Sequence, residues 1–232
     1  MKKLVVLTGA GISAESGIST FRDSGGLWEQ HRIEDVATFE GWLKNRKLVL
    51  EFYNQRRKQL FDVEPNAGHY ELARLEKDYE VQIITQNVDD LHERAGSTRV
   101  LHLHGELKKA RSVADDSYVV EIDGWELNEG MLCPQGAQLR PHIVWFGEAV
   151  PLIGHAAELC GEADYFLIVG TSLDVYPAAG LLNYVPHTAP VYLVDPNDVL
   201  TGTPDVIYVK APASTGVKYV ADELKTRSGE SS

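Results

Sequence analysis

Short apolar runs recur along the chain, and each is followed by glycine or by small polar residues. Runs of four to six residues are too short for a core helix and predict buried strands. Because longer segments with helical periodicity separate these runs, the pattern predicts an α/β protein with a mostly parallel sheet covered by helices on both faces. The predicted strands are residues 4–7, 81–85, 100–104, 165–172, 191–195 and 205–209, the fourth ending in a small polar turn.

Apolar residues at helical spacing fill much of the chain between these strands. One stretch is different, since residues 106–140 are mostly polar. Within it, polar and apolar residues alternate over Tyr118–Ile122. That pattern predicts an inserted antiparallel hairpin or small β module. The predicted helices begin at Ser13, lie as a pair within residues 39–61, and cover residues 67–77 and about 216–226.

The composition is that of a globular protein, with 44% hydrophobic residues, 24% charged residues and a formal net charge of −12. Proteins that bind nucleic acid usually carry a basic surface, so the acidic chain argues against a nucleic-acid partner. The charge is better suited to a cationic or lysine-bearing polypeptide. No run approaches the ~20 apolar residues of a membrane span, so we expect no membrane partner.

The two cysteines, Cys133 and Cys160, are expected to be free buried thiols, because nothing in the chain indicates secretion. The apolar run that follows Lys3 is too short for the core of a signal peptide, and a turn comes directly after it. We therefore expect a cytoplasmic protein, and we expect it to act as a monomer.

A glycine-rich turn follows the first predicted strand, where Gly9-Ala10-Gly11-Ile12-Ser13-Ala14 fits the Gly-x-Gly-x-x-Gly/Ala pattern of dinucleotide sites. The first glycine allows a tight turn, the second lets the backbone approach a pyrophosphate, and the helix N-terminus supplies N–H donors. An ordinary turn between strand and helix is the alternative. No strand ending in an acidic residue follows ~20 residues later, which disfavours a hydride-transferring dehydrogenase.

Two polar motifs follow later strands. The segment 85–90, Thr-Gln-Asn-Val-Asp-Asp, offers donors and acceptors for an amide and sugar hydroxyls, although a helix N-cap at Asn87 or Asp89 would also explain it. His102 and His104 fall on one face of a predicted strand that Gly105 is expected to end. A histidine there is suited to general-base catalysis, with a metal ligand or a packed structural histidine as the alternatives.

Taken in order, the motifs of the chain resemble those of the sirtuins, and most closely the bacterial CobB type and the class III, or desuccinylase, branch. Each motif alone is weak, but five in order, each at a strand end, make chance a poor explanation. The resemblance covers about residues 4–226 and is weakest over 106–135. The motifs are Gly9–Ser13 with Glu15–Gly17 and Phe21-Arg22, Thr85–Asp89, His104-Gly105, Leu139–Glu148 and Gly170–Leu173.

The resemblance implies a single sirtuin catalytic domain built from two parts. A large, NAD-binding, Rossmann-like part would comprise about residues 1–30, 66–106 and 141–232. A small part would come from two insertions, a helical one at about 31–65 and the remnant of a zinc module at about 107–140. NAD would be the co-substrate, and acylated-lysine proteins or peptides would be the partners.

The resemblance also implies a reaction and the residues that carry it. The acyl oxygen of the modified lysine would attack the nicotinamide ribose, His104 would deprotonate a ribose hydroxyl, and Asn87 would be the second catalytic residue. Lysine, nicotinamide and O-acyl-ADP-ribose would leave, while His102 would only support its strand. The NAD-binding residues would be Gly9, Ala10, Gly11, Ser13, Phe21, Arg22 and Trp28 on the phosphate and ribose side, Gln86, Asn87 and Asp89 at the nicotinamide, and Gly170, Thr171, Ser172, Val194, Asp195, Pro196 and Ala213 at the adenosine half.

Tyr53 and Arg56 lie three positions apart on one predicted helix face, where a phenol and a guanidinium could bind a carboxylate. A solvated basic helix is the alternative. By resemblance, this Tyr-x-x-Arg pair matches the class III acyl pocket, and Ala37 matches the small residue that leaves room for a longer acyl chain. We expect succinyl- and malonyl-lysine as substrates, with acetyl-lysine accepted, and Val144 and Phe146 would line the place where the peptide adds as a strand.

Two other functions are compatible with the same residues. A mono-ADP-ribosyltransferase would use the same NAD pocket and the same histidine with another nucleophile. A non-catalytic sensor of NAD or ADP-ribose would use the same fold, but it would leave His104 and Asn87 free to differ. Both residues are present with their neighbours intact, which favours catalysis.

The expected metal content separates the chain from the family it resembles. Sirtuins commonly hold a structural zinc with two Cys-x-x-Cys pairs, whereas residues 107–139 here contain Cys133 alone. Structural zinc needs four nitrogen or sulfur ligands, which one thiolate cannot supply. The sequence therefore predicts no structural zinc and no other metal site.

Overall fold

A parallel sheet of six strands forms the centre of the computed structural model, which describes residues 1–18, 31–199 and 205–229. Its strand order is β3-β2-β1-β7-β8-β9, and every neighbouring pair is parallel, so the predicted α/β fold is confirmed. The strands are β1 (Lys3–Thr8), β2 (Glu80–Thr85), β3 (Val100–His102), β7 (Tyr165–Val169), β8 (Val191–Val194) and β9 (Val206–Val209).

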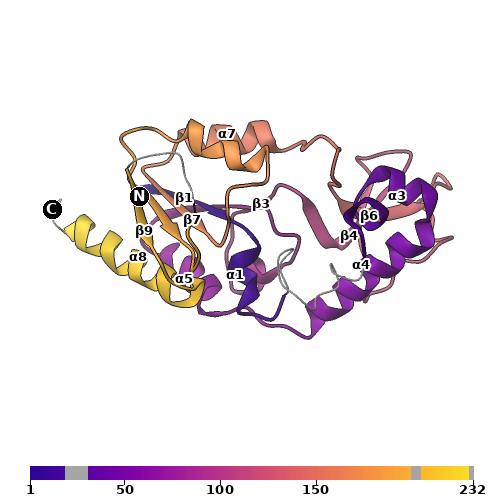
Figure 1. Cartoon of the computed structure of the whole chain (residues 1–232), viewed down its shortest axis with the longest axis horizontal. Coiled ribbons are helices and arrows are strands. Elements are labelled where there is room, and N and C mark those ends of the chain that lie inside the picture. Colours follow the sequence, from indigo (N-terminus) through magenta and orange to yellow (C-terminus); the bar gives the residue numbers. More distant parts are fainter. Residues whose placement is uncertain (19–30, 200–204, 230–232) are drawn as a thin grey trace.

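Helices cover both faces of this sheet, which explains why β7 and β8 are buried at every position and carry no charged residue. On one face, α5 (Ala67–Leu75) and α8 (Ala213–Gly229) pack together and bury residues such as Leu72 and Val217 (Figure 1). On the other face lie α7 (Ile153–Gly161) and the 3₁₀ helix η1 (Ala178–Tyr184). None of the helices in the described ranges is long and apolar enough to cross a membrane.

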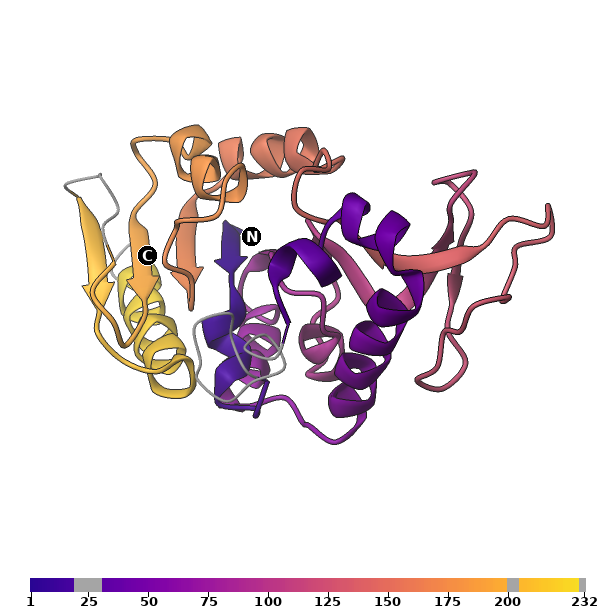
Figure 2. The same ribbon diagram turned by 45° about the vertical axis from the view of Figure 1, so that its right-hand side comes forward.

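A second core lies beside the sheet along the long axis of the molecule (Figure 2). Its antiparallel sheet has the order β5-β4-β6 and packs against three helices, so the predicted β module contains three strands rather than one hairpin. The domain boundaries predicted at residues 106 and 140 fall within two of these strands. The elements are α2 (Ile33–Val36), α3 (Phe39–Lys44), α4 (Arg46–Phe61), β4 (Gly105–Ser112), β5 (Val119–Glu121) and β6 (Leu139–Ile143).

A fully buried arginine joins α4 to the antiparallel sheet. Arg57 Nε donates to the Leu107 carbonyl at 2.6 Å, and its Nη1 donates to the Trp125 carbonyl at 2.7 Å. The same Nη1 reaches Asn54 Oδ1 at 2.9 Å, one turn earlier on the helix. Because a buried guanidinium is stable only when hydrogen-bonded, these contacts fix α4 against β4 and the loop after β5.

Asparagine caps decide where two of the longer helices begin. Asn45 Oδ1 accepts the Leu48 N–H at 3.1 Å before α4, and Asn66 forms a capping box with His69 before α5. Asn66 also donates from Nδ2 to the Ile12 carbonyl at 2.7 Å, which ties α5 to the short helix α1 (Ala10–Ala14). Helix α1 itself begins at Ala10, directly after Gly9 and three residues before the predicted start at Ser13.

The predicted strand over residues 100–104 is wrong at its end, because β3 stops at His102 and His104 lies in a turn. Gly105 does not end that strand; it begins β4 with a φ of +82°. A Cβ on Gly105 would lie 2.0 Å from the His142 carbonyl oxygen. Only glycine fits this conformation and this close approach, so the chain turns here from the parallel sheet into the antiparallel one.

Candidate functional site

The candidate site lies where the strand order of the parallel sheet reverses. The order runs from β1 to β2 and β3 in one direction and from β7 to β8 and β9 in the other. Open α/β sheets bind ligands at such a switch point, outside the carboxyl ends of the strands. The motifs that the sequence singled out follow β1, β2, β7 and β8, so the topology brings their loops to one edge.

Three glycines form the contact across the switch point. Gly9 N donates to the Val169 carbonyl at 3.0 Å, and Gly11 N donates to the Gly170 carbonyl at 2.8 Å. A Cβ on Gly11 would lie 2.7 Å from Gly170 Cα, and Gly170 itself has a φ of +63°. From the sequence, Gly11 was predicted to let the backbone approach a pyrophosphate. In the structure this glycine also lets the β1–α1 turn pack directly on the loop after β7.

Asn87, in the loop after β2, is 8% exposed, and its amide has a defined orientation. Its Nδ2 donates to the Gly9 carbonyl at 3.1 Å and to Ser13 Oγ at 3.2 Å. Since Ser13 Oγ gives its own proton to Asp89 Oδ2 at 3.0 Å, the serine oxygen accepts from Asn87. Within the part of the chain that the structure describes, no hydrogen bond engages the Asn87 amide oxygen, so this atom can accept one from a ligand.

Asp89 and Gln86 also have their polar atoms engaged by the protein. Asp89 is 6% exposed and accepts from Ser13 and from the Leu91 N–H. Burial raises the pKa of Asp89, and these two hydrogen bonds oppose that rise. Gln86 Nε2 donates to Thr171 Oγ1 at 3.1 Å, so the loop after β2 is linked to the loop after β7.

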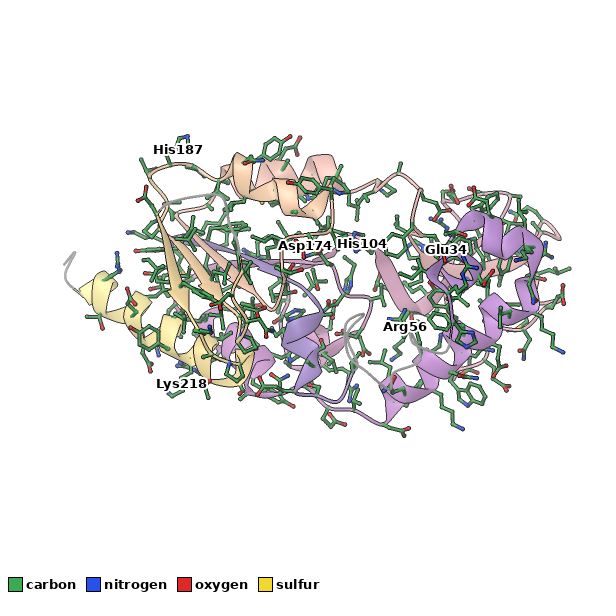
Figure 3. The ribbon with its side chains drawn as sticks, viewed as in Figure 1. Glu34, Arg56, His104, Asp174, His187 and Lys218 are labelled. Carbon is green, nitrogen blue, oxygen red and sulfur yellow. The ribbon has the colours of Figure 1, made fainter. Side chains whose placement is uncertain are left out.

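His104 lies between the parallel sheet and α4, in the turn before β4 (Figure 3). Its Nδ1 lies 3.0 Å from the Gln86 carbonyl, and because a carbonyl only accepts, Nδ1 carries the proton. Nε2 therefore holds the free electron pair. Burial lowers the pKa of His104, and the Gln86 carbonyl offsets part of that change. The ring is neutral near pH 7, as a general base must be.

The segment 144–146 links His104 to the residues predicted for the acyl-lysine side. Val144 N donates to the His104 carbonyl at 2.9 Å, and Phe146 N donates to the Ala37 carbonyl at 3.0 Å. Ala37 is buried, whereas the side chain of Phe146 is on the surface. The structure thus brings together three parts of the chain that lie far apart in the sequence, at Ala37, at His104 and at residues 144–146.

Tyr53 and Arg56 form an aromatic and cationic cluster on α4. The Arg56 guanidinium lies 5.7 Å from the Tyr53 ring centroid and 5.8 Å from that of Phe52. Tyr53 is 1% exposed, and its hydroxyl oxygen accepts the Trp145 Nε1–H at 3.0 Å. Burial raises the pKa of Tyr53 to about 12, against the charge of Arg56, so its hydroxyl keeps its proton.

The sequence reasoning missed the residues that hold this cluster. The Arg140 guanidinium lies over the Trp145 ring, 3.4 Å from the ring centroid. The Glu148 carboxylate accepts from Arg140 and from the backbone N–H of Trp145. Alternation along residues 144–146 was the available signal, since it turns Trp145 inward between two more exposed neighbours. A buried indole N–H requires an acceptor, but the sequence does not identify Tyr53 as that acceptor.

The residues predicted for the adenosine half lie after β7 and β8. Gly170 N donates to the Val194 carbonyl at 2.9 Å, and Asp195 Oδ1 accepts from Asn197 N in a local turn. The Glu15 carboxylate accepts from the backbone N–H and from the hydroxyl of Ser214. These contacts place buried Ala213 beside α1 and α5. Thr171 and Ser172 are half-buried, and Pro196 is exposed.

Three predicted NAD-binding residues, Phe21, Arg22 and Trp28, lie outside the described residues. Among residues 1–18, 31–199 and 205–229, no group of three or more His, Cys, Asp or Glu side chains could hold a metal ion. Cys133 is buried, with Ser112 Oγ 3.5 Å from its sulfur, and Cys160 is a buried residue of α7 itself. The expected absence of zinc remains a prediction.

Comparisons with known proteins identify a family. The profile of the Sir2 family matches residues 9–177. A curated protein of Bacteroides thetaiotaomicron, an NAD-dependent protein deacylase, is 57% identical over 231 residues, covering 97% of each chain. A solved Sir2 homologue in complex with NAD is similar with a TM-score of 0.88 and 36% identity, covering 97% of this chain and 90% of its own.

A second solved structure contains a peptide. It is a complex of Sir2 with a p53 peptide and NAD, and it is similar to this chain with a TM-score of 0.81 and 28% identity. The match covers 96% of this chain and 93% of that one. The likeness therefore extends over both the parallel sheet and the smaller module.

Proposed function

The chain belongs to the Sir2 family and is an NAD-dependent protein deacylase, and on this premise we propose that it removes acidic acyl groups, succinyl and malonyl, as well as acetyl groups from lysine. One observation supports the choice of acyl group. Tyr53 and Arg56 lie together on α4, and Trp145, between Val144 and Phe146, donates to the Tyr53 hydroxyl.

The residues at the switch point fit a dinucleotide. The glycine turns after β1 and β7 pack closely together, and the polar side chains of Gln86, Asn87 and Thr171 lie beside them as donors and acceptors. When bound, NAD would supply the ribose carbon to which the acyl oxygen bonds, as the bond between that carbon and nicotinamide breaks. His104 Nε2 then accepts a proton from a ribose hydroxyl, while the Gln86 carbonyl keeps the ring in the required tautomer. A water molecule is consumed as the amide C–N bond breaks, so that the acyl group would end as an ester on a ribose hydroxyl of ADP-ribose and the lysine would leave as a free amine.

Acylated-lysine peptides would lie along residues 144–146. The Sir2 complex with a p53 peptide supports a peptide partner. In this chain the segment is extended between two carbonyls, those of His104 and Ala37, which it contacts from opposite ends. Because the N–H groups of Val144, Trp145 and Phe146 are already donated within the chain, an added strand would pair with carbonyl groups of this segment. The net charge of −12 suits a lysine-bearing partner.

The chemistry of Tyr53 and Arg56 favours a carboxylate at the end of the acyl chain. Arg56 can bind a carboxylate through two N–H groups, and Tyr53 stays protonated and can donate its hydroxyl proton. A hydrogen bond to a charged group contributes about 1.5–3 kcal/mol. At 1.4 kcal/mol per factor of ten, Arg56 should therefore improve turnover of an acidic acyl-lysine by roughly 10–100-fold.

An Arg56→Met variant tests this proposal. Turnover of a succinyl-lysine peptide should fall by roughly 10–100-fold, whereas acetyl-lysine turnover should change far less. Mass spectrometry of nicotinamide, free lysine peptide and O-acyl-ADP-ribose measures both reactions. It also separates deacylation from transfer of ADP-ribose to protein.

Lys58→Met is the matched control, since Lys58 is an exposed cation on the same helix that lies over the Trp125 ring instead. We expect the control to leave the ratio of succinyl to acetyl turnover unchanged. Equal losses on both peptides in Arg56→Met would mean that Arg56 only supports the fold, and the acidic-acyl proposal would fail.

A further inference from the structure

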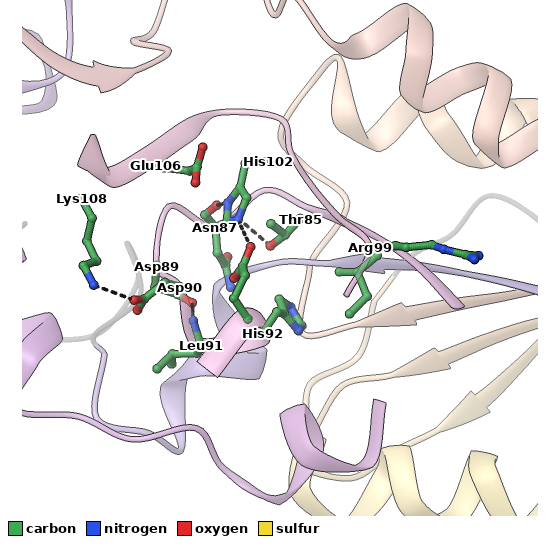
Figure 4. Close-up of polar contacts among 12 residues, drawn as sticks. Thr85, Asn87, Asp89, Asp90, Leu91, His92, Arg99, His102, Glu106 and Lys108 are labelled. Carbon is green, nitrogen blue, oxygen red and sulfur yellow. Dashed lines mark hydrogen bonds and ion pairs between the residues drawn. The ribbon is translucent and has the colours of Figure 1, made fainter. Parts of the chain in front are cut away.

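Two histidines hold successive carbonyl groups of the loop that carries Gln86 and Asn87. His104 Nδ1 binds the Gln86 carbonyl at 3.0 Å, and His102 Nδ1 lies 3.1 Å from the Asn87 carbonyl (Figure 4). The loop that links β2 to α6 (Leu91–Arg94) is therefore fixed from the side of β3 as well as through Ser13. His102 does more than support its strand.

The second ring nitrogen of His102 has a different partner from that of His104. His102 Nε2 lies 2.7 Å from Glu93 Oε1, and the imidazole is 9% exposed. A carbonyl and a carboxylate both accept hydrogen bonds, so each ring nitrogen of His102 must carry a proton. His102 is therefore a buried imidazolium paired with Glu93, only two positions from the neutral His104.

We propose that the His102–Glu93 ion pair is a positioning device that holds the Asn87 carbonyl, and with it the loop against which His104 and Asn87 are aligned. This inference relies on the proposed role of His104 as the base. His102 itself touches neither NAD nor substrate in this proposal. When His102 loses a proton, one of its two hydrogen bonds to an acceptor is lost, and the loop is no longer held from both sides.

Charged and titratable groups surround His102 from several elements. Glu93 and His92 face it from α6, Asp89 from the loop after β2, and Glu106 from β4. Burial alone would lower the pKa of His102. The hydrogen bond and charge of Glu93, the Asn87 carbonyl and Glu106 outweigh it and raise the pKa. His92 is buried and its pKa lies well below the usual value, so it stays neutral.

The two histidines should therefore limit activity at opposite ends of the pH range. His104 has a lowered pKa and must be neutral, so its protonation causes the loss on the acid side. His102 has a raised pKa and must be charged, so positioning is complete below about pH 6.5 and is lost as pH rises through that raised value. The plot of kcat/KM against pH should be bell-shaped.

Replacing Glu93 by glutamine removes the charge but keeps an oxygen that can accept from His102 Nε2. We expect Glu93→Gln to move the alkaline limb of the pH profile down by on the order of one pH unit, because the imidazolium loses its counter-charge. The acid limb should not move. The KM for NAD and peptide should change little, because the pair contacts neither, and the loss should appear in kcat.

Glu106→Gln is the control, since Glu106 is a neighbouring carboxylate that bonds Lys109 rather than His102. It should shift the alkaline limb much less than Glu93→Gln does. An alkaline limb that stays in place in a Glu93→Gln enzyme with unchanged thermal stability would overturn the proposal.

A measurement on the unmodified protein covers the case in which the variant fails to fold. NMR titration of the histidine ring signals should show His102 titrating above the usual histidine pKa of about 6.5 and His104 titrating below it. A His102 ring that titrates below the usual histidine pKa would overturn the proposal directly. The ratio of succinyl to acetyl turnover should be the same in Glu93→Gln as in the parent enzyme, so a failure of the acyl-group proposal would remain distinguishable.

Discussion

The sheet side of the site and the α4 side hold their functional groups by different means. On the sheet side, Asn87, Ser13 and Gly9 are joined by hydrogen bonds of 3.0 to 3.2 Å, with backbone packed directly against backbone. On the α4 side, Tyr53 and Arg56 are held by aromatic rings and one indole N–H. The first arrangement fixes single atoms, whereas the second packs aromatic rings around a cation.

This difference suggests how the two sides respond to change. A hydrogen-bonded loop loses its geometry when one buried member is removed, because its partner is left unsatisfied. An aromatic cluster loses contact area and one donor at a time, so we expect a substitution there to alter the preference among acyl groups. We expect substitutions on the sheet side to abolish the reaction and those on the α4 side to redirect it.

The largest effect should come from His104→Ala on the sheet side. Loss of the base should reduce deacylation of every acyl-lysine peptide by about 10²–10⁴-fold, whereas NAD binding, followed by calorimetry, should survive. His187→Ala is a suitable control, because His187 is exposed on the far side of the sheet (Figure 3). Near-normal turnover in His104→Ala would show that another group is the base.

A smaller and more selective effect should come from Trp145→Phe on the α4 side. The change removes the N–H that Tyr53 accepts but keeps an aromatic ring beneath Arg140. One neutral hydrogen bond contributes about 0.5–1.5 kcal/mol, so succinyl-lysine turnover should fall by roughly 2–10-fold.

Acetyl-lysine turnover should fall less, because the Tyr53 hydroxyl does not meet a carboxylate there. Trp42→Phe serves as the control, since Trp42 is equally buried and its ring centroid lies 5.8 Å from that of Trp145. Matching losses on both peptides in Trp145→Phe would assign the tryptophan to packing alone and would weaken the contrast between the two sides.

The smallest effect should come from treating the protein with a metal chelator. The smaller module contains one cysteine, and its core is formed by apolar side chains and Arg57, so a chelator should leave the melting temperature unchanged. Elemental analysis of untagged protein should find well under one zinc per chain. Stoichiometric zinc that is lost together with folding would contradict the prediction and would indicate unidentified ligands.

The sequence was sufficient for the features that depend on neighbouring residues. Strands β1, β2, β7, β8 and β9 were predicted from short apolar runs, and in β7 and β8 the run is continuous because both faces of the strand are buried. The site loops followed from the same reasoning, since each comes directly after a strand. Phe21, Arg22 and Trp28 remain predictions, because they lie outside the described residues.

The sequence was insufficient where the partner of a side chain lies far along the chain. Trp145 and Tyr53 are 92 positions apart, and Arg57 and Leu107 are 50 apart, so neither contact appears as a local pattern. The end of β3 was wrong for a different reason. Val100–His104 alternates like one strand, and only the packing of Gly105 against the His142 carbonyl shows where the chain turns.

The contacts that complete the cofactor side also determine when it can form during synthesis. Glu15 can form its hydrogen bonds only after Ser214, 199 positions later, has been synthesised. Gly9 and Gly11 likewise have no packing partner until the loop after β7 has been synthesised. A growing chain therefore displays its glycine turn long before that turn has a partner. Contacts of such long range form late and all together, so incompletely synthesised chains should neither bind NAD nor compete for it.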